Sequence, residues 1–222
     1  MDNRRIFGVT LITIGLLGLA AFVPLYTIQL QSYGGWGPMG GTMGGMMGGY
    51  NANPSGQRKT IDQAVRIAQS YLASFGNPDI ALDEIMEFQY NFYALFYEKS
   101  TGIRAFEMLV DPYTGQIFPE YGPNMMWNTK YGMMGGGMMW DYGASPTASM
   151  SVTKDQAKAV AEDYLKTHLL GVTVEDPDTF YGYYTVHILK DGEIYGMLSV
   201  NGYTGQVWYH NWHGAYFQTR EM

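Results

Sequence analysis

The residues of this chain with the most distinctive chemistry are its methionines. The chain has 16 methionines in 222 residues, and ten of them lie in two glycine-rich stretches, residues 37–51 and 123–143. Thioethers are soft, neutral ligands that select Cu(I) over hard cations, and tryptophans nearby could shelter a bound cation. The pattern therefore predicts that Cu(I) binds to Met39, Met43, Met46, Met47, Met125, Met126, Met133, Met134, Met138 and Met139.

Two other interpretations of the methionine-rich stretches stay open. Loops rich in Met, Trp and Tyr could dock on a partner membrane protein or on the bilayer surface. Glycine-rich segments also make flexible linkers that bind nothing. Exposed thioethers gain little from water and oxidise readily, so ten of them in two loops need a reason beyond linkage.

A second candidate metal site is the pair His210 and His213 in the segment "WYHNWHG". Two imidazoles three residues apart, beyond the end of a predicted strand, could share a metal ion with a Glu or Asp that completes the site. The alternative is that an aromatic-rich terminus carries two histidines without a function. Of the other histidines, we expect His168 to complement the C-terminal end of a helix and His187 to lie on a sheet face.

The sequence contains no recognisable catalytic motif. G-x-S-x-G, H-E-x-x-H and the phosphate-binding loop are absent, and no G-x-G-x-x-G joins a strand to a helix. Cysteine is also absent, which excludes thiol catalysis, disulfides and Cys-based metal sites. We therefore predict that the protein is not an enzyme and that it has no cofactor other than Cu(I).

The charge distribution predicts a membrane protein with no nucleic-acid partner. A net charge of −7 and a pI near 5.0 lack the basic face that nucleic acid requires. Arg4 and Arg5 precede 25 uncharged residues, 6–30, which are enough to span a bilayer. By the positive-inside rule, the N-terminus is cytoplasmic and the rest of a single-pass chain lies outside the cytoplasm. A cleaved signal peptide or a buried helix would be the alternatives.

Beyond the apolar segment, the sequence repeats itself. "TIDQAVRIAQSYL" begins at Thr60 and "TKDQAKAVAEDYL" begins at Thr153. Both carry Thr-x-x-Gln, a capping box, in front of an apolar stripe with helical spacing. We therefore expect an amphipathic helix at the start of each copy.

Each predicted helix is followed by strand-like sequence. Aromatic, β-favouring stretches at 86–99 and 179–190 come first, then 103–111 and 193–201, then a short strand after "DPYTGQ" or "NGYTGQ". The predicted fold class is α+β: an N-terminal transmembrane helix followed by two repeated units, each a helix packed on a three-stranded antiparallel sheet.

These units resemble the PepSY family, whose strands end in "VDPxTGxI". "LVDPYTGQIF" in the first copy is a close match, and "SVNGYTGQVW" in the second is weaker. The resemblance covers about residues 59–119 and 152–209. PepSY units occur in propeptides of thermolysin-like metalloproteases, in germination and sensor proteins, and as stand-alone extracytoplasmic modules. The resemblance implies a non-catalytic binding or inhibitory domain, with a protease or a membrane protein as partner.

The predicted organisation is therefore a membrane anchor (1–30), a Gly/Met-rich linker (31–58), a first PepSY-like unit (59–120), a Gly/Met-rich connector (121–150) and a second unit with an aromatic and histidine-containing tail (151–222). The leading hypothesis is a non-enzymatic extracytoplasmic binding module whose Met-rich loops bind Cu(I) for handling or tolerance. The alternative is a PepSY-type interaction or inhibitory protein, or an accessory subunit of a membrane complex, with no metal.

Overall fold

Both helices predicted from the repeat begin at a capping box in the computed structural model, which describes residues 56–132 and 149–222. In α2 (Ile61–Phe75), the Thr60 hydroxyl accepts from the Gln63 N–H at 3.3 Å, and the Gln63 side chain accepts from the Thr60 N–H at 2.8 Å. Thr153 and Gln156 repeat the arrangement at the start of α4 (Lys154–His168), with distances of 3.2 and 2.8 Å. The two predicted capping boxes are thus confirmed.

Two antiparallel sheets contain most of the remaining regular structure. In sheet A the strand order is β10-β1-β2-β3-β4, and in sheet B it is β5-β7-β8-β9 with β6 also paired to β7. The strands of sheet A are β1 (Ile80–Phe88), β2 (Phe92–Glu98), β3 (Arg104–Val110), β4 (Ile117–Pro119) and β10 (Tyr216–Glu221). Those of sheet B are β5 (Thr173–Val174), β6 (Asp178–Thr179), β7 (Tyr183–Lys190), β8 (Glu193–Asn201) and β9 (Val207–Tyr209).

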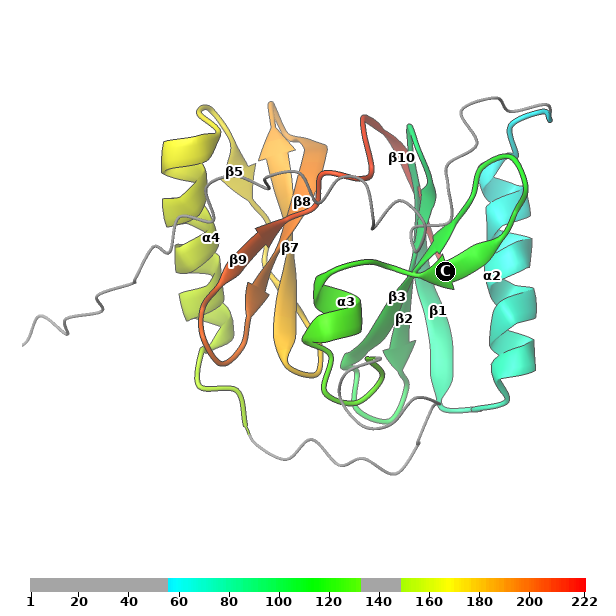
Figure 1. Cartoon of the computed structure of the whole chain (residues 1–222), viewed down its shortest axis with the longest axis horizontal. Coiled ribbons are helices and arrows are strands. Elements are labelled where there is room, and N and C mark those ends of the chain that lie inside the picture. The colour runs from blue at the N-terminus through cyan, green and yellow to red at the C-terminus, as the bar shows by residue number, and fades with distance from the viewer. Residues whose placement is uncertain (1–55, 133–148) are drawn as a thin grey trace, which may run out of the picture. The chain divides into compact units, whose positions relative to one another are not determined.

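The described elements all belong to one unit, Asn53–Met222, and form four layers in the order helix, sheet, sheet, helix (Figure 1). One hydrophobic core lies between α2 and sheet A, and a second lies between α4 and sheet B. Fully buried alanines let each helix approach its sheet closely: Ala64 and Ala68 in α2, and Ala157 and Ala161 in α4. A third core, which includes Phe88 and Leu109 of sheet A and Met197 of sheet B, fills the space between the sheets.

The two repeats also share the turn before their last strand. The Asp111 side chain accepts from the N–H groups of the residues two and three positions on, at 2.9 and 2.7 Å. The Asn201 side chain does the same at 2.9 and 3.0 Å. An Asx turn therefore forms in both units, although one reads Asp-Pro and the other Asn-Gly.

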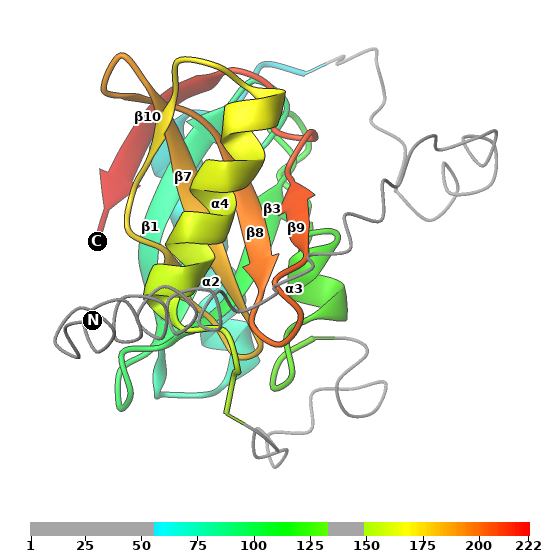
Figure 2. The same ribbon diagram turned by 90° about the vertical axis from the view of Figure 1, so that its left-hand side faces the viewer.

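The fold class predicted from the sequence is wrong. In place of two units that each pack one helix on a three-stranded sheet, the described residues form two five-stranded antiparallel sheets with few helices. The aromatic stretch 86–99 is not one strand, because it turns at residues 89–91 and divides between β1 and β2. Residues 173–174 and 178–179 form the short strands β5 and β6, and the C-terminal tail forms β10, which pairs with β1 of the first sheet (Figure 2).

The segment predicted to cross the membrane, residues 6–30, lies outside the described residues. Within residues 56–132 and 149–222, no helix is both long and apolar enough to span a membrane.

Candidate metal centre

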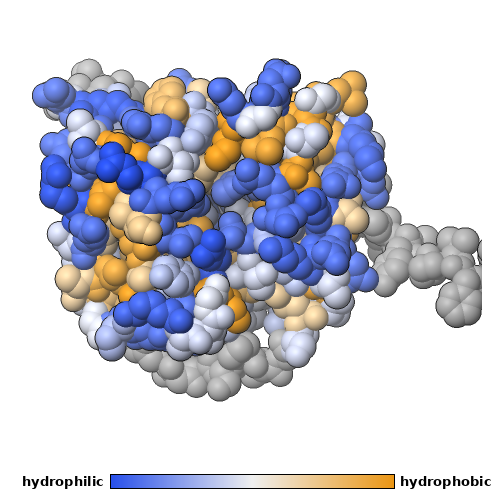
Figure 3. All heavy atoms as spheres, turned by 180° about the vertical axis from the view of Figure 1, so that it is seen from behind, coloured by the Kyte–Doolittle hydropathy of each residue, from blue (hydrophilic) through white to orange (hydrophobic). Residues whose placement is uncertain are grey.

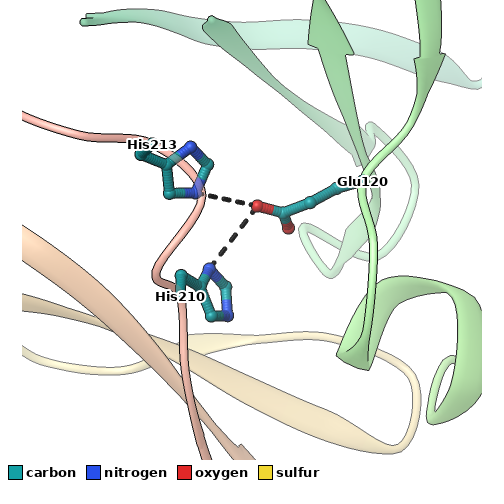
Figure 4. Close-up of side chains that lie close together, drawn as sticks. All are labelled: Glu120, His210 and His213. Carbon is teal, nitrogen blue, oxygen red and sulfur yellow. Dashed lines mark ion pairs between the residues drawn. The ribbon is translucent and has the colours of Figure 1, made fainter. Parts of the chain in front are cut away.

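Glu120, His210 and His213 converge between the two sheets (Figure 4). One carboxylate oxygen, Glu120 Oε1, lies 3.5 Å from His210 Nδ1 and 3.0 Å from His213 Nε2. The side chains of Glu120 and His210 are 0% exposed, and that of His213 is 2% exposed. The three residues form the one group among the described residues in which three His, Asp or Glu side chains could share a metal ion.

Glu120 and His210 reach the centre from equivalent positions of the repeat. Glu120 follows β4 directly, and His210 follows β9 directly. The Glu120 N–H donates to the carbonyl of Glu107 in β3 at 3.0 Å, and the His210 N–H donates to the carbonyl of Met197 in β8 at 3.0 Å. His213 lies three residues further along, in the loop that leads from β9 to β10.

A directed chain of hydrogen bonds determines which nitrogen of His210 faces the centre. The Thr185 hydroxyl donates to Glu107 Oε1 at 2.9 Å, so it can accept from the Ser199 hydroxyl, 3.2 Å away. Ser199 then accepts from His210 Nε2, at 3.0 Å. In the neutral imidazole this leaves Nδ1 without a proton, and Nδ1 is the atom that faces Glu120.

Asn91 orients His213 in the same manner. The Asn91 amide nitrogen donates to the carbonyl of Trp212 at 3.0 Å, which fixes the orientation of the amide. Its oxygen therefore accepts from His213 Nδ1, at 2.8 Å. The neutral His213 ring then has an unprotonated Nε2, which faces Glu120 Oε1.

Three buried atoms of the centre are left without a hydrogen-bond partner among the described residues: Glu120 Oε2, His210 Nδ1 and His213 Nε2. Although the imidazole nitrogens are close to Glu120, the contacts do not have hydrogen-bond geometry. The other carboxylate oxygen, Oε1, accepts from Trp212 Nε1 at 3.1 Å. A buried polar atom without a partner costs about 1–3 kcal/mol, so three at one point are a substantial cost.

The electrostatics of the centre depend on a second buried carboxylate, Glu107, which is 0% exposed. Burial favours a raised pKa for Glu120, but His210 and His213 outweigh it and hold the pKa below its usual range. Burial lowers the pKa of His213, although Glu120 opposes the shift. Burial and repulsion from Glu120 raise the pKa of Glu107 well above its usual value. Three hydroxyls donate to Glu107: those of Tyr93 at 2.7 Å, Thr185 at 2.9 Å and Tyr183 at 2.6 Å.

The ligand set and the spacing suit a transition-metal ion. Tetrahedral Zn²⁺ with bonds of about 2.0–2.1 Å places its ligand atoms about 3.3–3.4 Å apart. The two distances from Glu120 Oε1, 3.0 and 3.5 Å, bracket that value. All three candidate ligand atoms lie within 4.8 Å of one another.

The residues predicted from the sequence fall into two groups. His210 and His213 are brought together, and a Glu joins them. Met125 and Met126 lie at the end of the short helix α3 (Pro123–Met126), where Met125 is half-buried and Met126 is 52% exposed. The other eight methionines, Met39, Met43, Met46, Met47, Met133, Met134, Met138 and Met139, lie outside the described residues.

The other two histidines are where they were expected. His168 is in the last turn of α4, with Nδ1 2.7 Å from the carbonyl of Tyr164. His187 is in β7, with Nδ1 3.0 Å from Glu175 Oε2.

Sequence reasoning missed Glu120 because the resemblance to PepSY units ends at residue 119. The signal was nevertheless present: aligning "TGQIFPE" with "TGQVWYH" places Glu120 opposite His210. It also missed Glu107, Asn91 and Ser199, which read as ordinary strand and turn residues.

Comparisons with known proteins assign no family to the chain. No protein-family profile and no curated protein matches the sequence. Among solved structures, the chain is similar to the Bacillus megaterium YpeB C-terminal domain, with 12% sequence identity and a TM-score of 0.25. The similarity covers 68% of this chain and 62% of the YpeB chain.

Proposed function

We propose that this protein is a non-enzymatic binding module that holds a divalent transition-metal ion at Glu120, His210 and His213. The observation that supports the proposal most directly is that Glu120 Oε2, His210 Nδ1 and His213 Nε2 are buried, converge, and have no hydrogen-bond partner among the described residues. Since Ser199 and Asn91 take up the other ring nitrogens, both imidazoles present lone pairs to a carboxylate. A cation bound there satisfies all three atoms at once.

The ligand types favour a divalent transition-metal ion. Glu120, whose pKa is held below its usual range, supplies a buried negative charge that a bound cation compensates. Two imidazoles and one carboxylate suit Zn²⁺ and Cu²⁺ better than Ca²⁺ or Mg²⁺, which take oxygen ligands.

Burial favours binding over catalysis. Catalytic zinc sites keep a position open for water or substrate, but the three ligand side chains here are between 0% and 2% exposed. A surface groove in the described part of the chain runs along α2 and is lined by residues such as Lys59, Arg66 and Tyr71. None of its lining residues belongs to the metal centre.

The PepSY resemblance supports the same class of function. We also propose that both units are PepSY-like, that they lie outside the cytoplasm, and that a membrane protein or protease is a partner. Cu(I) binding by the Met-rich stretches is a further proposal and concerns a separate site, because none of the centre's three residues supplies a soft sulfur ligand.

The test is a Zn²⁺ titration of the purified full-length protein against a competing chelator. Zn²⁺ is the suitable probe because thioethers bind it poorly. We expect one ion per chain and a loss of affinity of at least about 100-fold in His210→Ala and in His213→Ala. His168→Ala, at an exposed position of α4, is the matched control. Wild-type protein that binds no Zn²⁺ or Cu²⁺, or variants that bind as tightly as wild type, would disprove the assignment.

A further inference from the structure

We propose that metal binding fastens the C-terminal segment, residues 210–222, to sheet A, so that the metal state controls whether β10 stays paired with β1. The inference rests on the proposed metal centre and concerns its consequence for the fold. It follows from three features of the segment: how weakly it packs, how its backbone pairs, and where the candidate ligands lie.

Side-chain packing holds β10 only weakly. Of its residues, Tyr216 packs against a hydrophobic core of the described structure. Phe217 is 54% exposed, and Gln218, Arg220 and Glu221 are also exposed. Figure 3 shows the side of the protein on which β10 lies, where hydrophilic residues separate small hydrophobic patches. The ion pair of Arg220 with Asp62 joins side chains that are 52% and 59% exposed, so it adds little stability.

Backbone pairing with β1 therefore provides most of the attachment. The register runs from Glu84 opposite Glu221 to Phe88 opposite Tyr216, with an irregularity between Glu87 and Phe88. At the start of the segment, the Tyr90 N–H donates to the carbonyl of His213 at 3.0 Å. An edge strand with few buried side chains opens more readily than the core of a sheet.

The candidate ligands lie where this attachment begins. His210 directly follows β9 of sheet B, and His213 lies in the loop that leads from β9 to β10 of sheet A. Glu120 directly follows β4 of sheet A. It accepts a hydrogen bond from Trp212, which lies 92 positions further along the chain. An ion bound to all three residues would therefore connect sheet A, sheet B and the C-terminal segment. The connection lies at the start of that segment, where detachment from sheet A would begin.

Loss of the ion has a defined structural consequence. Without it, His210, His213 and Glu120 oppose one another with buried atoms unpaired, which destabilises the closed arrangement of the segment. Release of β10 exposes the N–H and C=O groups of β1 along one edge of sheet A. The metal state would then decide whether that edge is free.

Amide hydrogen exchange of the full-length protein tests the inference without any variant. Peptides covering residues 214–222 should exchange at least about tenfold more slowly with saturating Zn²⁺ than after treatment with a chelator. Peptides from the β5 edge of sheet B, which lies at the far end of that sheet from β9, should change little. Exchange measures local opening directly.

A substitution in β10 gives a second, independent test of the inference. Thr219→Pro disrupts β10 and leaves the metal ligands intact. Because linkage is reciprocal, it should weaken Zn²⁺ binding by about the factor by which Zn²⁺ slows exchange of the tail. Val174→Pro in β5 is the matched control and should leave affinity unchanged.

The outcomes separate this inference from the proposed function. If Zn²⁺ binds stoichiometrically and tail exchange stays the same, the fastening is wrong while the metal centre stands. If Zn²⁺ and Cu²⁺ do not bind, both fail. Slower tail exchange together with weakened binding in Thr219→Pro supports both.

Discussion

Glu120 Oε1 lies 3.5 Å from His210 Nδ1, and the two residues occupy the same position of the two repeated units. Each follows the last strand of its unit, and each N–H donates to the carbonyl of an equivalent residue in the preceding strand. The centre therefore requires a carboxylate at this position in one unit and an imidazole at the same position in the other. A single unit cannot form it, and neither can two identical ones.

Glu120→Gln should abolish tight metal binding with little change of shape. The amide removes the anionic ligand, so we expect Zn²⁺ affinity to fall by at least about 100-fold in a chelator competition. Glu107→Gln is the informative comparison, because Glu107 does not ligate but accepts from Thr185 in the hydrogen-bond chain that orients His210, so its loss should cost about tenfold. Equal losses in the two variants would argue against the ligand assignment.

Asn91→Ala should weaken the centre through the orientation of His213. The substitution removes the acceptor of the Nδ1–H, which lies 2.8 Å from the amide oxygen. Loss of such a partner typically lowers metal affinity about 10–100-fold. Asn91→Asp keeps an acceptor and should retain most of the affinity, while Asn77→Ala, in the loop before β1, should have no effect. If Asn91→Asp binds as poorly as Asn91→Ala, a general structural defect is the better explanation.

The parts of the fold that could be predicted from sequence are those encoded locally. The capping boxes at Thr60 and Thr153 depend on residues three positions apart, and the Asx turns at Asp111 and Asn201 on residues two and three apart. Local signals of this kind survive in a single sequence. The hairpin at 89–91 was missed because aromatic residues run through it without the Gly or Pro that usually marks a turn.

Two of the three residues of the candidate site could be predicted from the sequence, for a similar reason. His210 and His213 are close in sequence, so their spacing raised the hypothesis of a shared ion. Their carboxylate partner comes from the other unit, and the pairing of β10 with β1 joins segments from opposite ends of the described chain. Contacts of this kind depend on how the two sheets face each other, which residue spacing does not encode.

Glu84 should make the stability of the fold depend on pH. Burial, reinforced by Asp178 and Asp83, raises its pKa from 4.5 to about 6, against the opposing effect of His187. Between these values the folded state holds a proton that the unfolded state releases, so the free energy of unfolding falls as pH rises through the window. A shift of this size corresponds to about 2 kcal/mol at most.

Denaturant unfolding at several pH values, in chelator-treated buffer, checks this expectation. Glu84→Gln should unfold with a flatter pH dependence between about 4.5 and 6 and should be more stable than wild type at pH 7. Glu162→Gln, at an exposed position of α4, should keep the wild-type slope. A variant whose slope matches that of wild type would show that Glu84 does not carry the effect.

Gly182→Ala should be among the more destabilising single-methyl additions in the fold. Gly182 has a φ of 100°, and a Cβ there would meet the carbonyl oxygen of Trp127 at 2.3 Å. The residue lies in the turn before β7, opposite the segment that follows α3. An alanine at this position would have to relieve both the backbone strain and the clash. We expect a loss of about 2–4 kcal/mol in denaturant unfolding. Gly205→Ala is the matched control: its φ is 71°, but a Cβ there meets nothing within 4 Å. Gly205→Ala should lower the free energy of unfolding by about 1 kcal/mol, the cost of the left-handed conformation alone. Equal losses in the two variants would mean that the close approach of Trp127 is not what requires glycine at position 182.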